Sequence, residues 1–162
     1  MGLLMGCRTG SLIDSEIIIA DTFDNNIKTQ ELINDSSYYS MVLYPGDDVH
    51  YTETYNFDLE MKNKKLLIFL IDATWTFARK MMSRSPSLQK LPKLSFSGEY
   101  RSKFDIKKQP ANYCLSTIES SYYLIKELQS AGVCDKNIDP KGLIAILKKM
   151  VELQQVHMIA KD

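Results

Sequence analysis

The sequence predicts an α/β domain in which a mainly parallel sheet is flanked by helices. Runs typical of strands alternate along the chain with segments of helical spacing, and this alternation favours parallel strands joined by helices. Residues 66–71 are apolar at every position, a pattern typical of a strand that is buried on both faces. The chain has 162 residues, enough for a core of its own, and we expect one domain over residues 1–162.

Local sequence patterns predict the strands and helices. Apolar runs predict strands, of which the first is expected to be buried, and the turn at residues 45–46 ends the second. Ser116 and Glu119 have the spacing of a capping box at the start of a helix, and we expect this role for Glu119 rather than a catalytic one. Expected strands are residues 16–20, 39–44, 66–71 and 93–96, and expected helices are residues 26–34, 75–82, 86–89, 117–131 and a last helix from residue 140. Residues 47–65 are expected to be mostly loop, and the apolar stripes of the last two helices are Ile118, Tyr122, Ile125 and Leu128, then Leu143, Leu147, Met150 and Val151.

Composition and charge limit the classes of protein to which the chain can belong. The hydrophobic share of 44% and charged share of 25% are those of a globular protein, and no apolar run is long enough to span a bilayer. We therefore expect a cytoplasmic protein with no membrane partner. Three widely spaced cysteines (Cys7, Cys114, Cys134) and two histidines predict reduced thiols and no metal site. The formal net charge is zero, but residues 79–108 contain nine basic and two acidic residues, which predicts either a solvated surface or a face for a polyanion.

The ends of the predicted strands are the expected place for a ligand, because parallel sheets bind ligands where their strands end. Three such segments are residues 43–46, 71–75 and 110–117. Asp72 follows the buried strand, and because desolvation makes a carboxylate a stronger base, Asp72 is a candidate for proton transfer. The alternatives are that Asp72 or Thr74 caps the next helix and that Trp75 packs in the core.

Several ordered motifs resemble one known family. Asp72-Ala73-Thr74-Trp75 matches the Asp-x-Thr-Trp motif after which the DTW-domain family is named. Leu43-Tyr44-Pro45 resembles the family's upstream loop, and further blocks follow in the family's order at residues 78–81, 88–92, 107–110 and 115–119. The chain therefore resembles the DTW-domain family of tRNA-uridine aminocarboxypropyltransferases.

This resemblance implies a fold and an activity. The implied fold is SPOUT-like, with a trefoil knot whose loops hold S-adenosylmethionine at the strand ends. The implied reaction moves the 3-amino-3-carboxypropyl group of this cofactor to N3 of a tRNA uridine and leaves methylthioadenosine. Two alternatives are a SPOUT-type RNA methyltransferase and a non-catalytic relative that binds RNA or cofactor. The family's usual cysteine-rich amino-terminal segment does not precede the motifs here, which keeps the non-catalytic alternative open.

The resemblance also implies site residues. The expected catalytic residues are Asp72, as base for the N3 proton or as orienting group, Thr74, as a hydrogen-bonding group, and Trp75, as a face for a base or for the sulfonium. The expected cofactor-binding residues are Leu43, Tyr44, Pro45, Ile71, Asp72, Leu115, Ser116 and Thr117, where amides at a helix start suit a carboxylate. The expected tRNA phosphate contacts are Arg79, Lys80, Arg84, Lys103, Lys107 and Lys108. Lys103 stands near a place where the family often has arginine, and lysine lacks the planar fork of a guanidinium.

Overall fold

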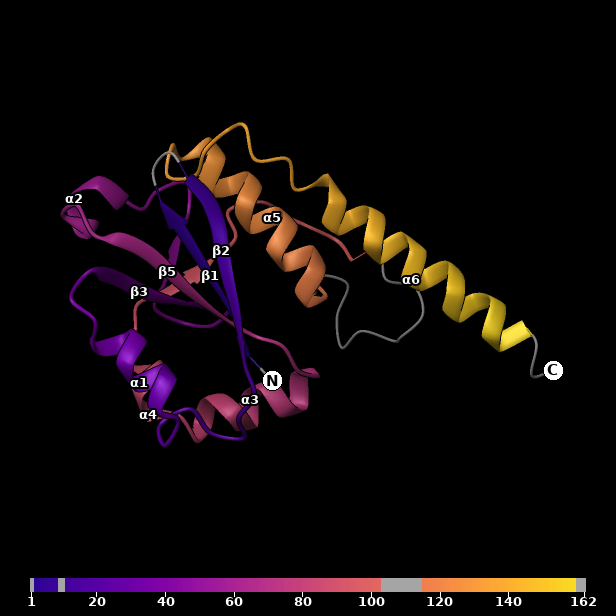
Figure 1. The fold of residues 1–162 in the computed structure, drawn as a ribbon, viewed down its shortest axis with the longest axis horizontal. Coiled ribbons are helices and arrows are strands. Elements are labelled where there is room, and N and C mark those ends of the chain that lie inside the picture. Colours follow the sequence, from indigo (N-terminus) through magenta and orange to yellow (C-terminus); the bar gives the residue numbers. More distant parts are fainter. Residues whose placement is uncertain (1, 9–10, 103–114, 160–162) are drawn as a thin grey trace.

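The computed structural model describes residues 2–8, 11–102 and 115–159 and shows a six-stranded sheet with helices on both faces (Figure 1). The strands lie in the order β2-β1-β5-β3-β6-β4. The last four of these run parallel, whereas β1 pairs antiparallel with both β2 and β5. The predicted, mainly parallel α/β sheet is thereby confirmed. Along the chain the elements are β1 Gly2–Arg8, β2 Ser11–Ile18, α1 Ile27–Asn34, β3 Tyr38–Leu43, β4 Val49–Tyr51, α2 Phe57–Met61, β5 Lys65–Ile71, α3 Trp75–Ser83, α4 Pro86–Gln89, β6 Lys93–Ser95, α5 Thr117–Ser130 and α6 Lys141–Ile159.

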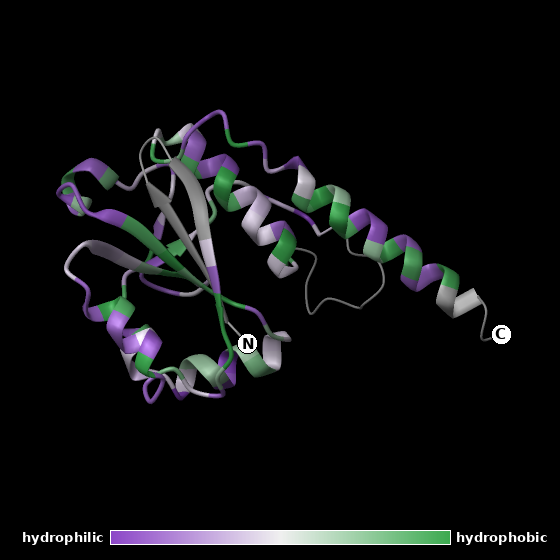
Figure 2. Ribbon diagram, viewed as in Figure 1, coloured by the Kyte–Doolittle hydropathy of each residue, from purple (hydrophilic) through white to green (hydrophobic). Residues whose placement is uncertain are grey.

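Strand β5 separates two hydrophobic cores. Residues 66–70 are each at most 5% exposed, and β5 appears as a hydrophobic band within the sheet in Figure 2. Its side chains alternate between the faces, as the two-residue period of a strand requires. Leu66, Ile68 and Leu70 pack against α5 on one face. Leu67 and Phe69 pack against α1, α3 and α4 on the other.

The two carboxyl-terminal helices start and pack as their sequences predict, with one exception. Helix α5 begins with a complete capping box between Ser116 and Glu119, and it buries Leu124 and Leu128 on the sheet. Helix α6 lies against α5, buries Leu147 and extends past the amino-terminal end of α5 (Figure 1). Met150 was predicted for the buried stripe of α6 but is 41% exposed, so this part of the prediction is wrong. Within the described part of the chain, no helix is long and apolar enough to cross a membrane.

Two strands and one burial pattern were not predicted. Residues 16–20 were expected to form a buried strand, but β2 is the edge strand of the sheet, with only one face covered. Ile18 is therefore 6% exposed, whereas Ile17 is 59% and Ile19 79% exposed. Strand β1, which pairs between β2 and β5, and the three-residue β4 were both missed.

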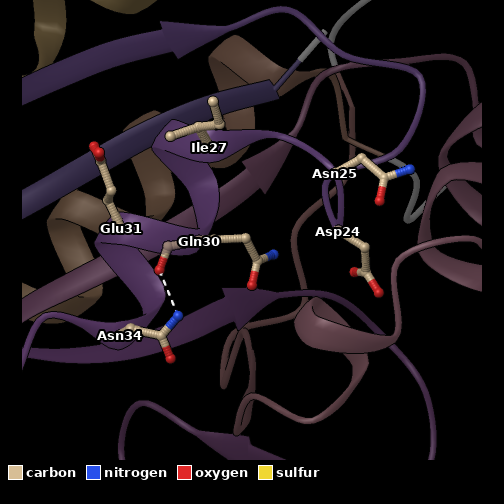
Figure 3. A pocket seen from close by; sticks show the side chains of 6 residues that line it. All are labelled: Asp24, Asn25, Ile27, Gln30, Glu31 and Asn34. Atoms are coloured by element: carbon tan, nitrogen blue, oxygen red, sulfur yellow. Dashed lines mark hydrogen bonds between the residues drawn. The ribbon is translucent and has the colours of Figure 1, made fainter.

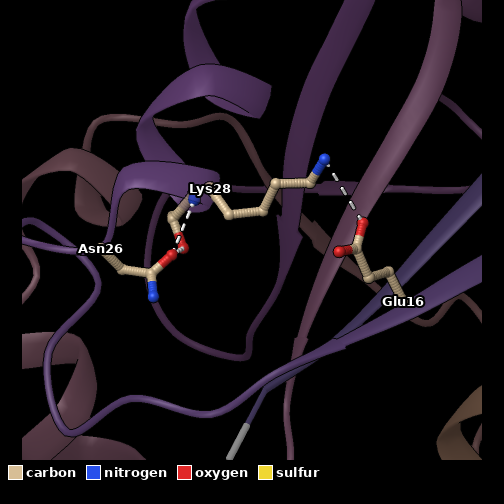
Figure 4. A network of polar contacts seen from close by, with 4 residues as sticks. Glu16, Asn26 and Lys28 are labelled. Carbon is tan, nitrogen blue, oxygen red and sulfur yellow. Dashed lines mark hydrogen bonds and ion pairs between the residues drawn. The ribbon is translucent and has the colours of Figure 1, made fainter.

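The amino end of helix α1 has a capping hydrogen bond and an ion pair with the sheet (Figure 4). The side-chain oxygen of Asn26 accepts from the backbone N–H of Thr29 over 2.9 Å and so caps the helix. Lys28 pairs with Glu16 of β2 over 3.7 Å. Because both charged side chains are about half exposed (49% and 54%), their pair contributes little to stability, and packing holds α1 in place.

The described residues do not test the predicted trefoil knot, because the connection between β6 and α5 is only partly described. Residues 103–114 of this connection lie outside the described part of the chain. The knot therefore stays a prediction, while the layered α/β arrangement around β5 does not depend on it.

The core beneath α5 should determine stability. Leu124 is fully buried, so Leu124→Ala should lower the free energy of unfolding by about 2–5 kcal/mol, because it removes packed atoms and leaves a cavity. Urea unfolding followed by circular dichroism measures this change. Leu59→Ala is the matched control, since Leu59 on α2 is 64% exposed, and its effect should stay within about 0.5 kcal/mol. Equal losses in the two variants would contradict the placement of α5 on the sheet.

Candidate functional site

The ends of β3 and β5 lie side by side at the carboxyl edge of the parallel strands. Leu43, the last residue of β3, pairs with Leu70 of β5 and with Leu94 of β6. The backbone N–H of Tyr44 extends this ladder by donating to the Leu94 carbonyl over 3.1 Å. The two strand-end segments predicted to bind the cofactor, residues 43–45 and 71–74, therefore begin next to each other.

Asp72, the first residue after β5, is joined to the start of α5. The hydroxyl of Thr117 donates to Asp72 Oδ1 over 2.7 Å, and both residues are half-buried. The second oxygen, Oδ2, has no hydrogen-bond partner among the residues that the structure describes. A carboxylate that is fixed through one oxygen and free at the other can accept a proton or a hydrogen bond from a ligand.

Helix α3 begins directly after Asp72 but does not use this residue as its cap. Thr74 occupies the N-cap position, and its side chain makes no capping hydrogen bond. Asp72 instead bonds to Thr117, so the alternative in which Asp72 only caps α3 is wrong. Trp75 is half-buried and belongs to neither hydrophobic core. The alternative in which Trp75 packs in the core is therefore wrong. The first N–H groups of α3 and of α5 have no partner inside their own helices, and both helices start at this site (Figure 1).

The start of α5 is organised by the buried carboxylate of Glu119, which is 2% exposed. Its Oε2 accepts from the backbone N–H of Ser116 over 2.9 Å, and Ser116 Oγ accepts from the backbone N–H of Glu119 over 3.3 Å. This confirms the predicted capping box. Because Ser116 directly precedes Thr117, the same contacts also fix the residue that holds Asp72.

Two opposite effects act on the pKa of Tyr44, which follows β3. Partial burial raises the pKa of the Tyr44 phenol, whereas the positive charge of Arg79 on α3 lowers it. Arg79 is also one of the predicted tRNA phosphate contacts.

Most predicted ligand-binding positions fall at this carboxyl edge. Arg79, Lys80 and Arg84 are exposed on α3 and at its end, and none makes an ion pair within the described residues. Leu115 and Pro45 lie on the loops that lead into α5 and out of β3. The predicted contacts Lys103, Lys107 and Lys108, and residues 111–114 of the predicted cofactor loop, lie outside the described residues.

A shallow depression elsewhere does not coincide with any predicted site residue (Figure 3). It is formed by α1 and the loop before it. Its lining side chains are Asp24, Asn25, Ile27, Gln30, Glu31 and Asn34. Asp24 is held there by the backbone N–H of Ser87 over 3.0 Å. Because its charged groups are acidic, this depression does not suit an anionic ligand such as RNA.

Metal ligands do not gather in the described part of the chain: no three His, Cys, Asp or Glu side chains there could hold an ion together. Cys134 is buried in the core beneath α5.

Comparison with known proteins decides the family. The model of the DTW domain matches residues 6–155. The chain belongs to the DTW-domain family. It is also similar to a protein of Mus musculus named tRNA-uridine aminocarboxypropyltransferase 2, with 30% identity over 119 residues. That match covers 73% of this chain but 37% of the relative, so the chain spans little more than a third of the relative's length. No solved structure matches the chain significantly.

In this DTW domain, the residues of the family's motif occupy distinct structural positions. Asp72 directly follows the central strand and bonds to Thr117 of α5, Thr74 is the N-cap of α3, and Trp75 is the first residue of that helix. The motif therefore spans the turn between the carboxyl end of β5 and the start of α3.

One group of polar contacts along α5 was not predicted. Ser102 donates to Glu119 over 2.8 Å, and Tyr100 donates to Glu127 over 2.8 Å. These bonds join residues 17 and 27 positions apart, so no local spacing rule indicates them. The available signal was the presence of two glutamates, Glu119 and Glu127, within the expected helix.

The Tyr44–Arg79 pair can be tested by titration. Arg79→Gln should raise the pKa of Tyr44 further, because only the effect of burial remains. Carbon NMR of ring-labelled tyrosine, assigned with Tyr44→Phe, measures this pKa. Lys80→Gln is the matched control and should leave the pKa of Tyr44 nearly unchanged. An unchanged pKa of Tyr44 in Arg79→Gln would contradict an effect of the Arg79 charge on this loop.

Proposed function

We propose that this DTW domain transfers the 3-amino-3-carboxypropyl group of S-adenosylmethionine to N3 of a uridine in tRNA. The proposal is supported by membership of the family and by the activity after which the mouse relative is named. The single structural observation that carries it is the hydrogen bond from Thr117 to Asp72 at the end of β5. This bond leaves one carboxylate oxygen available where three chain segments meet.

The residues present fit the chemistry of this cofactor. S-adenosylmethionine supplies an electrophilic carbon next to a sulfonium, together with an amino and a carboxylate group. The free N–H groups at the start of α5 suit the carboxylate, because a helix amino end favours negative charge. The ring of Trp75 and the carboxylate of Asp72 suit positive charge. The same edge of the sheet therefore offers complementary groups for both charges of the amino acid part.

The proposed role of Asp72 is that of a general base. Uridine N3 keeps its proton near neutral pH, so its attack requires a group that takes this proton. Asp72 Oδ2 accepts the proton while Thr117 holds Oδ1 in place. The N3–carbon bond forms as the carbon–sulfur bond breaks, and methylthioadenosine leaves with the electron pair of that bond. The exposed cations of α3 bind phosphates of the tRNA and add affinity without reading the sequence. The trefoil knot of the SPOUT class belongs to the same proposal.

The reaction is identified by its products. Undermodified tRNA, incubated with the protein and S-adenosylmethionine, should gain the 3-amino-3-carboxypropyl mass on uridine and release methylthioadenosine. Mass spectrometry of digested nucleosides and chromatography of the spent cofactor measure the two products. A methyl group with S-adenosylhomocysteine would indicate a methyltransferase instead. Binding of tRNA or cofactor with no product would indicate a non-catalytic relative.

The role of Asp72 is tested by Asp72→Asn. Asparagine keeps the shape and the acceptor for Thr117 but cannot take the N3 proton, so single-turnover rates should fall by roughly 10²–10⁴-fold. Binding of cofactor and tRNA should change much less. Asp58→Asn on α2 is the matched control and should leave the rate unchanged, because Asp58 is exposed and away from this edge. A rate for Asp72→Asn within a few-fold of wild type would remove Asp72 from the chemistry.

A further inference from the structure

Residues 97–102, which follow β6, lie along α5 and are held there by Glu127. Its Oε2 accepts from Thr52 Oγ1 and from the backbone N–H of Ser97, the latter over 3.1 Å. Its Oε1 accepts from the backbone N–H of Gly98 over 3.0 Å and from the hydroxyl of Tyr100 over 2.8 Å. Each carboxylate oxygen thus serves two donors, and charge-assisted bonds of this kind are the stronger ones in proteins.

Tyr100 adds a second attachment to the same helix. Its ring stacks on that of Tyr123, with 3.8 Å between centroids and 15° between planes. Burial and the bond to Glu127 raise the pKa of the Tyr100 phenol, so its hydroxyl remains a donor at neutral pH. Ring and hydroxyl together fix Tyr100 in one orientation on α5.

The other end of this segment is attached at the candidate site. Ser102 donates to Glu119 Oε2 over 2.8 Å, and the same oxygen accepts from the backbone N–H of Ser116. The next residue, Thr117, donates to Asp72. Ser102 is therefore connected to Asp72 through Glu119 and two consecutive residues of α5.

Arg101 stands between these two attachments. The residue before it is fixed through Glu127 and the residue after it through Glu119, so its backbone has little freedom. Its side chain is exposed and makes no ion pair with any described residue. Glu119 and Glu127 are occupied by other donors, and Glu99, two residues before Arg101, makes no ion pair with it, so the guanidinium remains available to an external anion.

We propose that Arg101 binds a tRNA phosphate beside the target uridine, and that Glu127 and Glu119 are positioning residues that hold it there. This inference rests on the proposed function and adds to it a named phosphate contact at the reacting end of the sheet. A guanidinium meets two phosphate oxygens at once, and a backbone fixed beforehand loses less freedom on binding. RNA is the partner because Arg101 lies on the surface, outside the half-buried surroundings of Asp72 and Thr117.

The contact is tested first by Arg101→Gln. The affinity for tRNA should fall roughly three- to tenfold, and the slope of log affinity against log salt should decrease by about one phosphate contact. The affinity for S-adenosylmethionine should stay the same. Lys136→Gln, an exposed cation between α5 and α6, is the control and should leave tRNA affinity unchanged. A loss of cofactor affinity, or an unchanged salt slope, in Arg101→Gln would overturn the phosphate assignment.

The positioning role is tested by a double-mutant cycle. In Glu127→Gln one carboxylate oxygen becomes an NH2 group, so the backbone N–H of Ser97 or Gly98 loses its acceptor. This variant should lower tRNA affinity roughly threefold in the wild-type background and have no effect in the Arg101→Gln background. Additive losses would mean that Glu127 does not act through Arg101.

Two further measurements keep the outcomes distinct. Hydrogen exchange at Ser97 and Gly98 should become faster in Glu127→Gln, and unchanged exchange would contradict the attachment itself. If Glu127→Gln does not fold, Tyr100→Phe removes a single donor from Glu127 and keeps the ring stack, and it should show the same dependence on Arg101. If the wild-type protein neither binds nor modifies tRNA, the proposed function is overturned. Hydrogen exchange at Ser97 and Gly98 still tests whether Glu127 holds residues 97–102 against α5.

Discussion

Burial of β5 on both faces is the constraint from which the rest of the fold follows. Because residues 66–70 are excluded from water on both sides, helices must cover each face of the sheet, and burying one such side chain contributes about 1.5–3 kcal/mol. The backbone groups of β5 are paired by β1 on one side and β3 on the other. The strand can therefore present polar atoms only at its end. Asp72 is the first residue at which the chain leaves this packed environment, and this places a carboxylate at the edge between α3 and α5.

Helix α5 connects the core to this edge. Leu124 and Leu128 fix one face of the helix on the sheet, while Glu119 and Glu127 fix the segment that follows β6 against it. A carboxylate removed from water is unfavourable unless donors surround it, and Glu119 meets this requirement with several donors on one oxygen. The polar contacts therefore depend on the apolar ones: a rotation of α5 on the sheet would move Thr117 away from Asp72 and both glutamates away from their donors.

The sequence predicted those elements whose signal is local. The apolar run of β5, the capping box of α5 and the proline at the start of α4 each indicate their element within a few residues. The convergence of Asp72 and Thr117 followed from the rule that parallel strands end at one edge. Strand β4 could not be predicted, because three residues with mostly exposed side chains have no periodicity. The attachment of Tyr100 to Glu127 could not be predicted either, since it depends on how α5 lies on the sheet.

The formal net charge of the chain is zero, so the electrostatics of the carboxyl edge depend on which of its charged side chains are paired. The donors that the described residues provide to the carboxylates of Asp72, Glu119 and Glu127 are hydroxyl and amide groups. The two ion pairs of the described residues lie on other elements, one between α1 and β2 and one within α6. Arg79 and Arg101 make no ion pair with any of the described residues. Because a phosphate contact requires a cation that is not already paired, the use of uncharged donors for these carboxylates is consistent with the proposed phosphate contacts of both arginines.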